Sequence, residues 1–336
     1  MHLSMIFVDG LGLGSKDNNP VFLARTPHLD RLLGGHFLWG ENPEIHHNNC
    51  TLFSLDATLG IPGIPQSATG QTTLWTGVNA AALLGYHLRG FPNAGLKEII
   101  QKENIFKKLI AKGKKVTFAN AFFRDIADLI KAGQINLSAS TLCALNAGLR
   151  LRTKQDLLAG KAVFQDITNE IFRQREALRE AQIKAQQKTQ REAQQEKQLE
   201  ETSEEVPILQ PVIAGQRLAR LSQEYDFTLF EYFQTDLRGH KRQLEKAITV
   251  IETLDEFLGG YLSIAESAAL SGLKMALILT SDHGNIEDLT TSTHTLNKVP
   301  ALCWSNFGLK WPRLQSITDV TPAIIDLLDG KYKIDS

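Results

Sequence analysis

Short apolar runs alternate along the chain with longer stretches whose apolar residues recur every three or four positions. The apolar runs predict buried strands at residues 5–8, 115–121, 226–233 and 274–280. The helical periodicity predicts helices at residues 26–33, 103–113, 217–224 and 243–270. Because strands and helices alternate in this way, the chain is predicted to be an α/β protein with a doubly wound, largely parallel sheet.

A different pattern separates the two α/β stretches. Residues 122–210 have a helical pattern, and residues 174–205 consist mainly of Gln, Glu, Lys, Arg and Ala. This composition predicts one long, mostly solvated helix or a helical hairpin; a coiled-coil surface for a partner is the less favoured alternative, because the few apolar residues keep no heptad. We therefore predict a discontinuous core, residues 1–121 and 211–336, interrupted by a helical cap or lid insertion at 122–210.

The charge balance changes the picture of possible partners. The chain has 336 residues, with 36 basic and 37 acidic side chains and a net charge of −1. Proteins that bind nucleic acid or membrane surfaces without specificity collect phosphates with an excess of basic residues, and this chain has no such global excess. We expect no nucleic-acid or membrane partner. Any anion that the protein binds must be attracted by positive charge at the binding site itself.

The cysteines and the N-terminal segment bear on the cellular compartment. Cys50, Cys143 and Cys303 lie far apart in the sequence, which argues against a disulfide framework and against a thiolate zinc site. The apolar stretch at residues 5–8 is followed at once by Asp9, so it is too short for a signal peptide. With no run of about 18 apolar residues either, we expect a soluble cytoplasmic protein.

Metal-ligating residue types follow the predicted strands. They are Asp9, then Asp236 and His240, then Asp282 and His283, and finally His294 on a polar loop. Each alone has an ordinary explanation, because an Asp after a strand is commonly a turn or capping residue. Together they occupy the carboxyl ends of strands in one sheet, where ligands bind in α/β folds. Asp and His are ligands of divalent metals, so this placement predicts a metal site.

A candidate nucleophile lies in the segment 62–77. Ser67 follows a turn-rich stretch containing Pro62 and Pro65, and precedes a run compatible with a helix. A serine at a helix N-terminus lies where the backbone N–H groups and the helix dipole favour a bound anion. The alternative is that Ser67 only caps the helix.

These motifs, in this order, resemble the metalloenzymes of the alkaline phosphatase superfamily, and most of all cofactor-independent phosphoglycerate mutase and phosphopentomutase. The resemblance covers roughly residues 1–121 and 211–336. It rests on the motifs Asp9-Gly10-Leu11-Gly12, Ser67-x-x-Gly70, Asp236-x-x-Gly239-His240, Asp282-His283-Gly284-Asn285-x-Glu287 and Thr293-His294-Thr295. The segment Thr73-Leu74-Trp75-Thr76-Gly77 is similar instead to the residues just after the nucleophile in nucleotide pyrophosphatases.

The resemblance implies two divalent metal ions and a phosphoserine intermediate. Asp236, His240 and His294 would hold one ion. The other would be held by Asp9, Asp282, His283 and Ser67, with Ser67 also the nucleophile. Mixed carboxylate and imidazole ligands favour Mn²⁺ or Zn²⁺, with Mg²⁺ possible but less suited to imidazole.

Other polar residues are candidates for contact with the substrate. Arg89, His87 and Arg238 could reach a phosphate, although surface ion pairs would explain the arginines equally well. Glu287 is a candidate to orient a ligand histidine. The insertion differs from the α/β cap of the mutases, so their substrate-binding residues have no counterparts that can be assigned here.

Three functions follow from these observations. The first is a two-metal phosphohydrolase or phosphotransferase that acts on a small phosphate ester through a phosphoserine. The second is an intramolecular phosphomutase of the phosphoglycerate or phosphopentose type, and the third is a metal-bound scaffold whose long helix binds a partner. The sequence leaves the substrate and the oligomeric state open.

Overall fold

The structure is a computed structural model of the chain. It describes all residues except 37–39, 41–43, 124–135, 192–203 and 335–336, and it describes no side chains for residues 183–191. In the described residues, no helix is long and apolar enough to cross a membrane.

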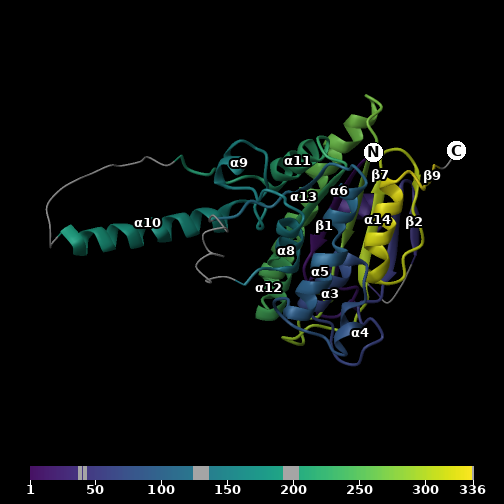
Figure 1. Ribbon diagram of the computed structural model, residues 1–336, viewed down its shortest axis with the longest axis horizontal. Helices are drawn as coiled ribbons and strands as arrows, with labels where there is room; N and C mark the ends of the chain where they lie inside the picture. Colours follow the sequence, from purple (N-terminus) through teal and green to yellow (C-terminus); the bar gives the residue numbers. More distant parts are fainter. Residues whose placement is uncertain (37–39, 41–43, 124–135, 192–203, 335–336) are drawn as a thin grey trace.

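A seven-stranded mixed sheet forms the centre of the molecule (Figure 1), with the strand order β2-β3-β7-β6-β1-β5-β4. Strands β6, β1, β5 and β4 pair in parallel, whereas β7, β3 and β2 extend the sheet by antiparallel pairing. The strands are β1 (His2–Val8), β2 (Ile45–His47), β3 (Cys50–Leu55), β4 (Val116–Phe118), β5 (Phe227–Tyr232), β6 (Met275–Thr280) and β7 (Val299–Ser305). The predicted α/β class with a largely parallel sheet is confirmed. The antiparallel strands β2, β3 and β7 were not part of that prediction.

Each face of the sheet carries its own apolar core. In β1, Ile6 and Val8 belong to one core, whereas Met5 and Phe7 belong to the other, because successive side chains of a strand point to opposite faces. Both faces are covered by helices, so β1 and β6 are apolar along almost their whole length. This explains why their sequences show continuous apolar runs rather than alternation.

Two sets of helices cover the two faces. One core includes residues of α2 (Pro27–Leu33), α11 (Pro211–Ser222) and α13 (Leu244–Ala269). The other includes residues of α3 (Ser67–Thr76), α5 (Ala94–Glu103), α6 (Ile105–Ala111), α8 (Ala139–Asn146) and α14 (Val320–Leu328). The remaining elements are α1 (Pro20–Leu23), α4 (Ala80–Leu84), α12 (Gln234–Lys241), the 3-10 turn η1 (Ile317–Asp319) and the pair β8 (Leu309–Lys310) and β9 (Lys333–Ile334).

Most predicted elements form close to their expected bounds. The predicted helix 103–113 begins later, as α6, because the Asn104 side chain accepts a hydrogen bond from the Lys107 N–H and caps the helix. The predicted strand 115–121 forms regular pairing only over β4. Beyond it, Asn120 and Ala121 make single bridges to Val163 and Arg152.

Three helices of the segment 122–210 are described: α8, α9 (Lys154–Leu158) and α10 (Glu170–Arg191). Between them the chain is not helical, and Gly148 and Gly160 there adopt positive φ angles of 74° and 69°, which end helices. Helix α8 packs against the core through Cys143 and Ala144, whereas α10 extends away from the sheet (Figure 1). The predicted long helix at 174–205 is thus described as α10 up to Arg191, and residues 192–203 lie outside the described part of the chain. The division into a core and a cap stays a prediction.

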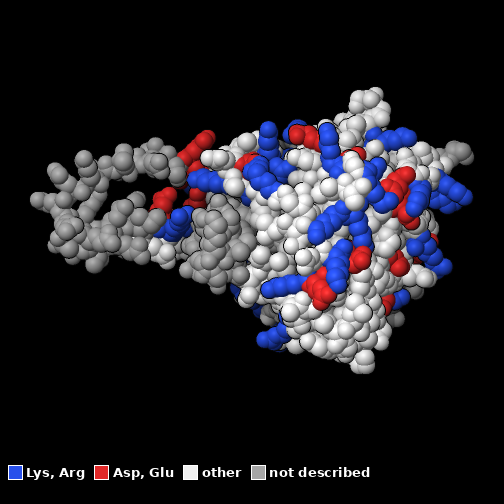
Figure 2. Space-filling view, viewed as in Figure 1, with Lys and Arg blue, Asp and Glu red and all other residues white. Residues whose placement is uncertain are grey.

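The visible surface carries charges of both signs. Figure 2 shows Lys and Arg side chains interspersed with Asp and Glu on the face it presents, in keeping with a net charge near zero. Ion pairs between charged side chains include Lys112 with Asp329 and Lys331 with Asp326.

Candidate metal centre

The predicted metal-ligating residues meet at one edge of the sheet. Asp9 directly follows β1, Asp236 lies in the first turn of α12 after β5, and Asp282 and His283 closely follow β6. These three strands are adjacent and parallel, so their carboxyl ends lie at the same edge. His294 comes from the loop between β6 and β7 and joins them there.

One group, which we call the buried half, consists of Asp9, Asp282 and His283. The Nε2 atom of His283 lies 3.5 Å from Asp9 Oδ1 and 3.5 Å from Asp282 Oδ2. Asp282 and His283 are 0% exposed and Asp9 is 7% exposed. Among the described residues, Asp9 Oδ1 and both carboxylate oxygens of Asp282 have no hydrogen-bond partner.

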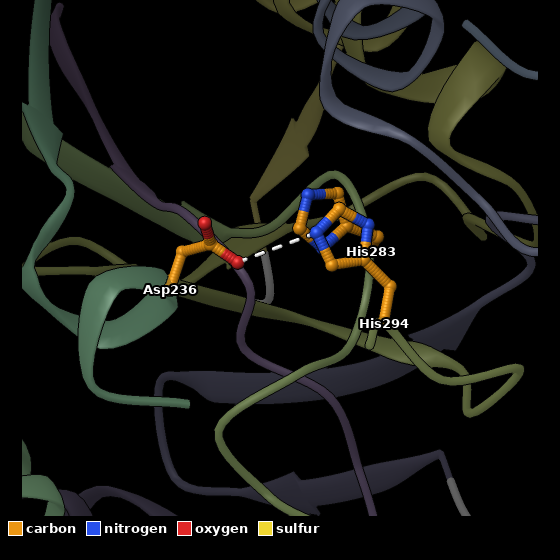
Figure 3. A group of neighbouring side chains, drawn as sticks. All are labelled: Asp236, His283 and His294. Atoms are coloured by element: carbon orange, nitrogen blue, oxygen red, sulfur yellow. Dashed lines mark ion pairs between the residues drawn. The ribbon is translucent and has the colours of Figure 1, made fainter. Parts of the chain in front are cut away.

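The second group, the open half, consists of Asp236, His240 and His294. Asp236 Oδ1 lies 3.5 Å from His294 Nε2, and Asp236 Oδ2 lies 3.3 Å from His240 Nε2. The side chain of His240 is 42% exposed, so this half reaches the solvent. Figure 3 shows Asp236 facing the rings of His283 and His294, which stack with centroids 3.6 Å apart and thereby place the two halves side by side.

Backbone carbonyls orient two of the histidines. The Nδ1 atom of His240 lies 2.8 Å from the Ser292 carbonyl, and the Nδ1 atom of His294 lies 2.9 Å from the Pro65 carbonyl. A carbonyl only accepts, so each Nδ1 carries a proton, and in the neutral form of each ring Nε2 is left with a lone pair that faces the cluster. This is the tautomer that a metal-ligating histidine needs.

Burial dominates the protonation of the buried half. It raises the pKa of Asp282 to about 7, with the negative charge of Asp236 adding to the effect. It also raises the pKa of Asp9 well above its usual value, supported by the charges of Asp282 and Asp236. Burial lowers the pKa of His283 to about 3. Burial is the main cause of all three shifts, because it disfavours the charged form of a carboxyl group and of an imidazole alike.

The open half has the opposite protonation pattern. Burial alone would raise the pKa of Asp236, but hydrogen bonds from His240 and Asn285 and the charge of His283 outweigh it and bring the pKa to about 2. The hydrogen bond to Asp236 raises the pKa of His240 to about 9. Asp236 and His240 therefore stabilise each other's charged forms, whereas the hydrogen bonds around Asp282 do not offset the effect of its burial.

The donor set fits divalent cations. Three buried carboxylate oxygens lack partners, and two overlapping groups bring carboxylate oxygens and imidazole nitrogens within 4.8 Å of one another: Asp9, Asp282 and His283, and Asp236, His283 and His294. Leaving a charged oxygen buried and unpaired is costly, and a bound cation removes that cost. The geometry adds His283 to both groups, whereas the sequence resemblance implied it for one ion only.

Ser67 is the first residue of α3, and its side chain faces the buried half. Its Oγ lies 3.0 Å from His283 Nε2. Gln66 occupies the capping position and no side chain caps this helix, so the alternative that Ser67 is only a cap is wrong. Gly70 allows the close approach of α3, because a Cβ there would lie 2.9 Å from the Asp282 carbonyl oxygen.

Glu287 and Asn285 hold the loops that carry the ligands. Buried Glu287 accepts hydrogen bonds from the Gly12 and Asn285 N–H groups, the Thr295 hydroxyl and the Asn297 amide. The expected contact with a histidine is not among its hydrogen bonds within the described residues. The Asn285 amide donates a hydrogen bond to Asp236 Oδ1 at 2.6 Å and so holds that carboxylate in place. Asn285 is part of the quoted sequence motif, but the sequence alone assigned it no role.

The three candidates for substrate contact lie in different environments. Arg89 is exposed in a loop beside α3, where the Leu88 backbone hydrogen-bonds to Thr69. His87, in the same loop, contacts the Ile61 carbonyl through Nε2 at 3.2 Å. Arg238 lies on α12 two residues from both Asp236 and His240, and residues two apart on a helix do not share a face. Contact of Arg89, His87 and Arg238 with a substrate stays a prediction.

Comparison with known proteins agrees with this geometry. The model of the metalloenzyme superfamily matches residues 1–331. The chain belongs to the metalloenzyme superfamily. The family resemblance drawn from the motifs is thereby confirmed, and a metal ion belongs to the chemistry of this enzyme family.

Individual relatives match in part. The chain is 32% identical over 124 residues to 2,3-bisphosphoglycerate-independent phosphoglycerate mutase of Wolinella succinogenes, a match that covers 35% of this chain and 24% of the mutase. The PH0037 protein of Pyrococcus horikoshii has a similar fold, with a TM-score of 0.53, 15% identity and coverage of 100% and 98%. The alkaline phosphatase of the Antarctic bacterium TAB5 aligns with a TM-score of 0.45, 12% identity and 98% coverage of each chain. The chain thus spans about a quarter of the length of that mutase.

Proposed function

We propose that this metalloenzyme is a two-metal phosphohydrolase or phosphotransferase that acts on a small phosphate ester through a phosphoserine at Ser67. One observation carries the proposal. The Ser67 hydroxyl, at the start of a ten-residue helix, lies 3.0 Å from His283 and faces a cluster of buried carboxylates that lack partners. A nucleophile, an anion-binding helix end and a divalent-metal site therefore coincide at one point.

The proposed ligand sets follow the two halves of the site. Asp9, Asp282, His283 and the Ser67 hydroxyl would hold one ion, and Asp236, His240 and His294 the other. Two bound ions would lower the pKa of the Ser67 hydroxyl and balance the charge of the phosphate during displacement. The mixture of carboxylate and imidazole donors favours Mn²⁺ or Zn²⁺ over Mg²⁺.

The residues of this chain would divide the reaction between them. The first-turn N–H groups of α3 orient the phosphate oxygens. Ser67 Oγ then attacks phosphorus, forming the Oγ–P bond while the bond from phosphorus to the ester oxygen breaks; the proton lost by the Ser67 hydroxyl is balanced by the one that the departing ester oxygen takes up as it becomes an alcohol. Water attacks the phosphoserine in a second displacement, which releases inorganic phosphate and restores the Ser67 hydroxyl.

An intramolecular phosphomutase is the second candidate. The observation that favours it is the similarity to the phosphoglycerate mutases, which reaches 32% identity over 124 residues. In that reaction a second hydroxyl of the same substrate, rather than water, would take the phosphoryl group from Ser67. The similarity covers only 35% of this chain and 24% of the mutase, so it does not extend to the whole of either protein.

The proposal is tested by replacing Ser67. Protein stripped with a chelator and reloaded with Mn²⁺ or Zn²⁺ is expected to hydrolyse 4-nitrophenyl phosphate, and Ser67→Ala to lose at least about 10³-fold in kcat. Ser267→Ala, at an exposed position on α13, is the matched control and should keep wild-type turnover. Mass spectrometry of the quenched wild-type reaction should detect one phosphate on Ser67. Full activity in Ser67→Ala would rule the nucleophile out.

A labelling experiment separates the two candidates. With 3-phosphoglycerate or ribose 5-phosphate carrying ³²P, a phosphohydrolase releases labelled inorganic phosphate. A mutase instead moves the label to another hydroxyl of the same molecule without release. Internal transfer that depends on Ser67 would replace the hydrolase with the mutase.

A further inference from the structure

A cavity of about 330 Å³ lies beside the metal centre but includes none of its proposed ligands. It is formed where β4 and β5 end, at the start of α8, by residues 164–165 after α9 and by Arg175 of α10. Its volume is in the range of small-molecule sites. We call it the aromatic cavity, after the phenylalanines that line it: Phe91, Phe118, Phe122, Phe123, Phe164 and Phe233.

The phenylalanines are held in place by the fold rather than exposed on loops alone. Phe118 and Phe164 are each 2% exposed, and the rings of Phe118 and Phe122 meet edge to face with centroids 6.0 Å apart. Phe91, at 52% exposed, lies at the rim. Rigid aromatic walls of this kind bind flat apolar groups by stacking and by edge-to-face contact.

A single acidic side chain faces this apolar space. Glu231, on β5, is 1% exposed and lines the cavity. The Ser140 side chain hydrogen-bonds to the carboxyl group of Glu231. The Oε1 atom of Glu231 has no hydrogen-bond partner among the described residues. Two hydrogen bonds of 2.8 Å between the backbone of Glu231 and the Asn120 side chain fix its position. An unpaired buried acceptor is costly, and a ligand that donates to it removes the cost.

The cavity adjoins the reacting end of the site from two sides. Phe91 belongs to the same loop as Arg89, and this loop hydrogen-bonds to the first turn of α3 through Thr69. Phe233 immediately precedes α12, which carries Asp236, and its ring lies 6.3 Å from that of Phe7. Glu231 itself lies within electrostatic reach of Asp282 and Asp9, so a ligand that extends from Ser67 into the cavity can meet Glu231.

We propose that the aromatic cavity binds the leaving group of the substrate, and that this group is an uncharged aromatic ring whose far end donates an N–H or O–H hydrogen bond to Glu231. This proposal rests on the proposed function for the orientation of the substrate, with its phosphate at Ser67. An uncharged ring is favoured over an organic cation because Arg175 lines the same cavity and would repel a cation. The cavity would thus select aryl phosphates that carry a donor.

Two substrates test the donor. The leaving groups of 4-aminophenyl phosphate and 4-methylphenyl phosphate are nearly equal in size and acidity, but only the amino compound can donate to Glu231. With Mn²⁺-loaded protein, kcat/KM should be at least about tenfold higher for the amino compound, because the other leaves the buried acceptor unpaired. A ratio near one in the wild-type protein would overturn the proposal.

Variants assign the preference to Glu231. In Glu231→Met the ratio should fall to about one, whereas Glu231→Gln, which keeps an accepting oxygen, should retain part of it. Glu256→Met, at an exposed position on α13, is the matched control and should keep the full ratio. Circular dichroism establishes that each variant is folded. A wild-type ratio in folded Glu231→Met would also overturn the proposal.

A binding experiment separates this proposal from the proposed function. Equilibrium dialysis of 4-aminophenol and 4-methylphenol against metal-free protein requires no catalysis. The amino compound should bind at least about fivefold more tightly to the wild type and equally to Glu231→Met. If this difference is found without any turnover, the proposed function is wrong, but the binding of a donor-bearing aromatic ring beside Glu231 is supported. If Ser67-dependent turnover is found but both phenols bind equally, the cavity assignment fails alone.

Discussion

The buried half of the metal centre and the open half use the same residue types in opposite electrostatic states. In the buried half, Asp282 has a pKa of about 7 and His283 a pKa of about 3, because burial disfavours both charged forms. In the open half, Asp236 has a pKa of about 2 and His240 a pKa of about 9, because each hydrogen-bonds to the other. Burial and pairing therefore decide the state of each group, and residue type does not.

The difference indicates which half depends more on a cation. Asp236 and His240 already balance each other, so the open half is satisfied as it stands. Both oxygens of Asp282 lack a hydrogen-bond partner among the described residues, so the buried half gains most from a bound ion. We therefore expect the first divalent ion to bind at the buried half and the second, more weakly, at the open half.

The largest expected effect follows from Asp282→Asn. Turnover should fall by about 10³-fold or more, because a fully buried carboxylate that we propose as a metal ligand is lost. The same change should make the chelated, metal-free protein more stable by about 1–3 kcal/mol, because it removes a buried carboxylate that lacks a partner. Urea denaturation with chelator and turnover with saturating Mn²⁺ measure the two effects. Exposed Asp17→Asn is the control, and a chelated Asp282→Asn protein no more stable than wild type would contradict the comparison.

A smaller effect is expected for the open half. His240→Ala should weaken the second ion by about 10–100-fold and should be largely restored by raising the metal concentration, since Asp236 and His294 remain. Titration of the activity with Mn²⁺ measures the shift. His46→Ala, at an exposed position on β2, should leave the titration unchanged. If no metal concentration restores the activity, the open half depends on its full set of ligands as strongly as the buried half does, and the comparison does not hold.

The smallest expected effect is a pH dependence of the stability of metal-free protein. The raised pKa of Asp282 means that its favourable contribution is lost as pH rises from its ordinary value of 3.8 to about 7. The raised pKa of His240 means that its contribution is lost as pH rises from 6.5 to about 9. We expect a change on the order of 2 kcal/mol for Asp282, and under about 1 kcal/mol for half-exposed His240 after screening.

Urea denaturation in chelator at a series of pH values measures both windows. Asp282→Asn should make the decline in the lower window shallower, with Asp9 and Glu231, whose pKa values are also raised by burial, supplying the remainder, and should leave the share of His240 in the upper window. His240→Gln should do the reverse. If either variant flattens both windows, the two halves titrate as one unit and the contrast between them does not hold.

The sequence predicted the half of the sheet that carries the ligands and missed the other half. β1, β5 and β6 are largely apolar runs, which mark strands covered on both faces. β3 and β7 were not predicted. β7 contains Pro300, and the two strands pair across a long stretch of sequence, Cys50 with Trp304, which no local pattern reports.

Sequence reasoning also could not assign Glu231 and Asn285. A lone acidic residue inside an otherwise apolar strand was the available signal for Glu231, because charged residues are seldom buried without a purpose. Asn285 lies within the quoted motif, but its contact with Asp236 joins two segments that are 49 residues apart. Such contacts depend on how the segments pack.

The sequence by itself determined the fold class, the order of the ligand-bearing segments and the residue types of the metal centre, because buried strands and the polar residues that end them leave local patterns. Only the tertiary structure decided that Ser67 faces His283 instead of capping its helix, and that His283 contributes to both groups of ligands. It also decided that Asp236 accepts a hydrogen bond from Asn285, whereas Asp282 is fully buried beside another carboxyl group, that of Asp9. These outcomes depend on burial and on distances of a few ångströms between segments far apart in the chain, which the order of residues does not record.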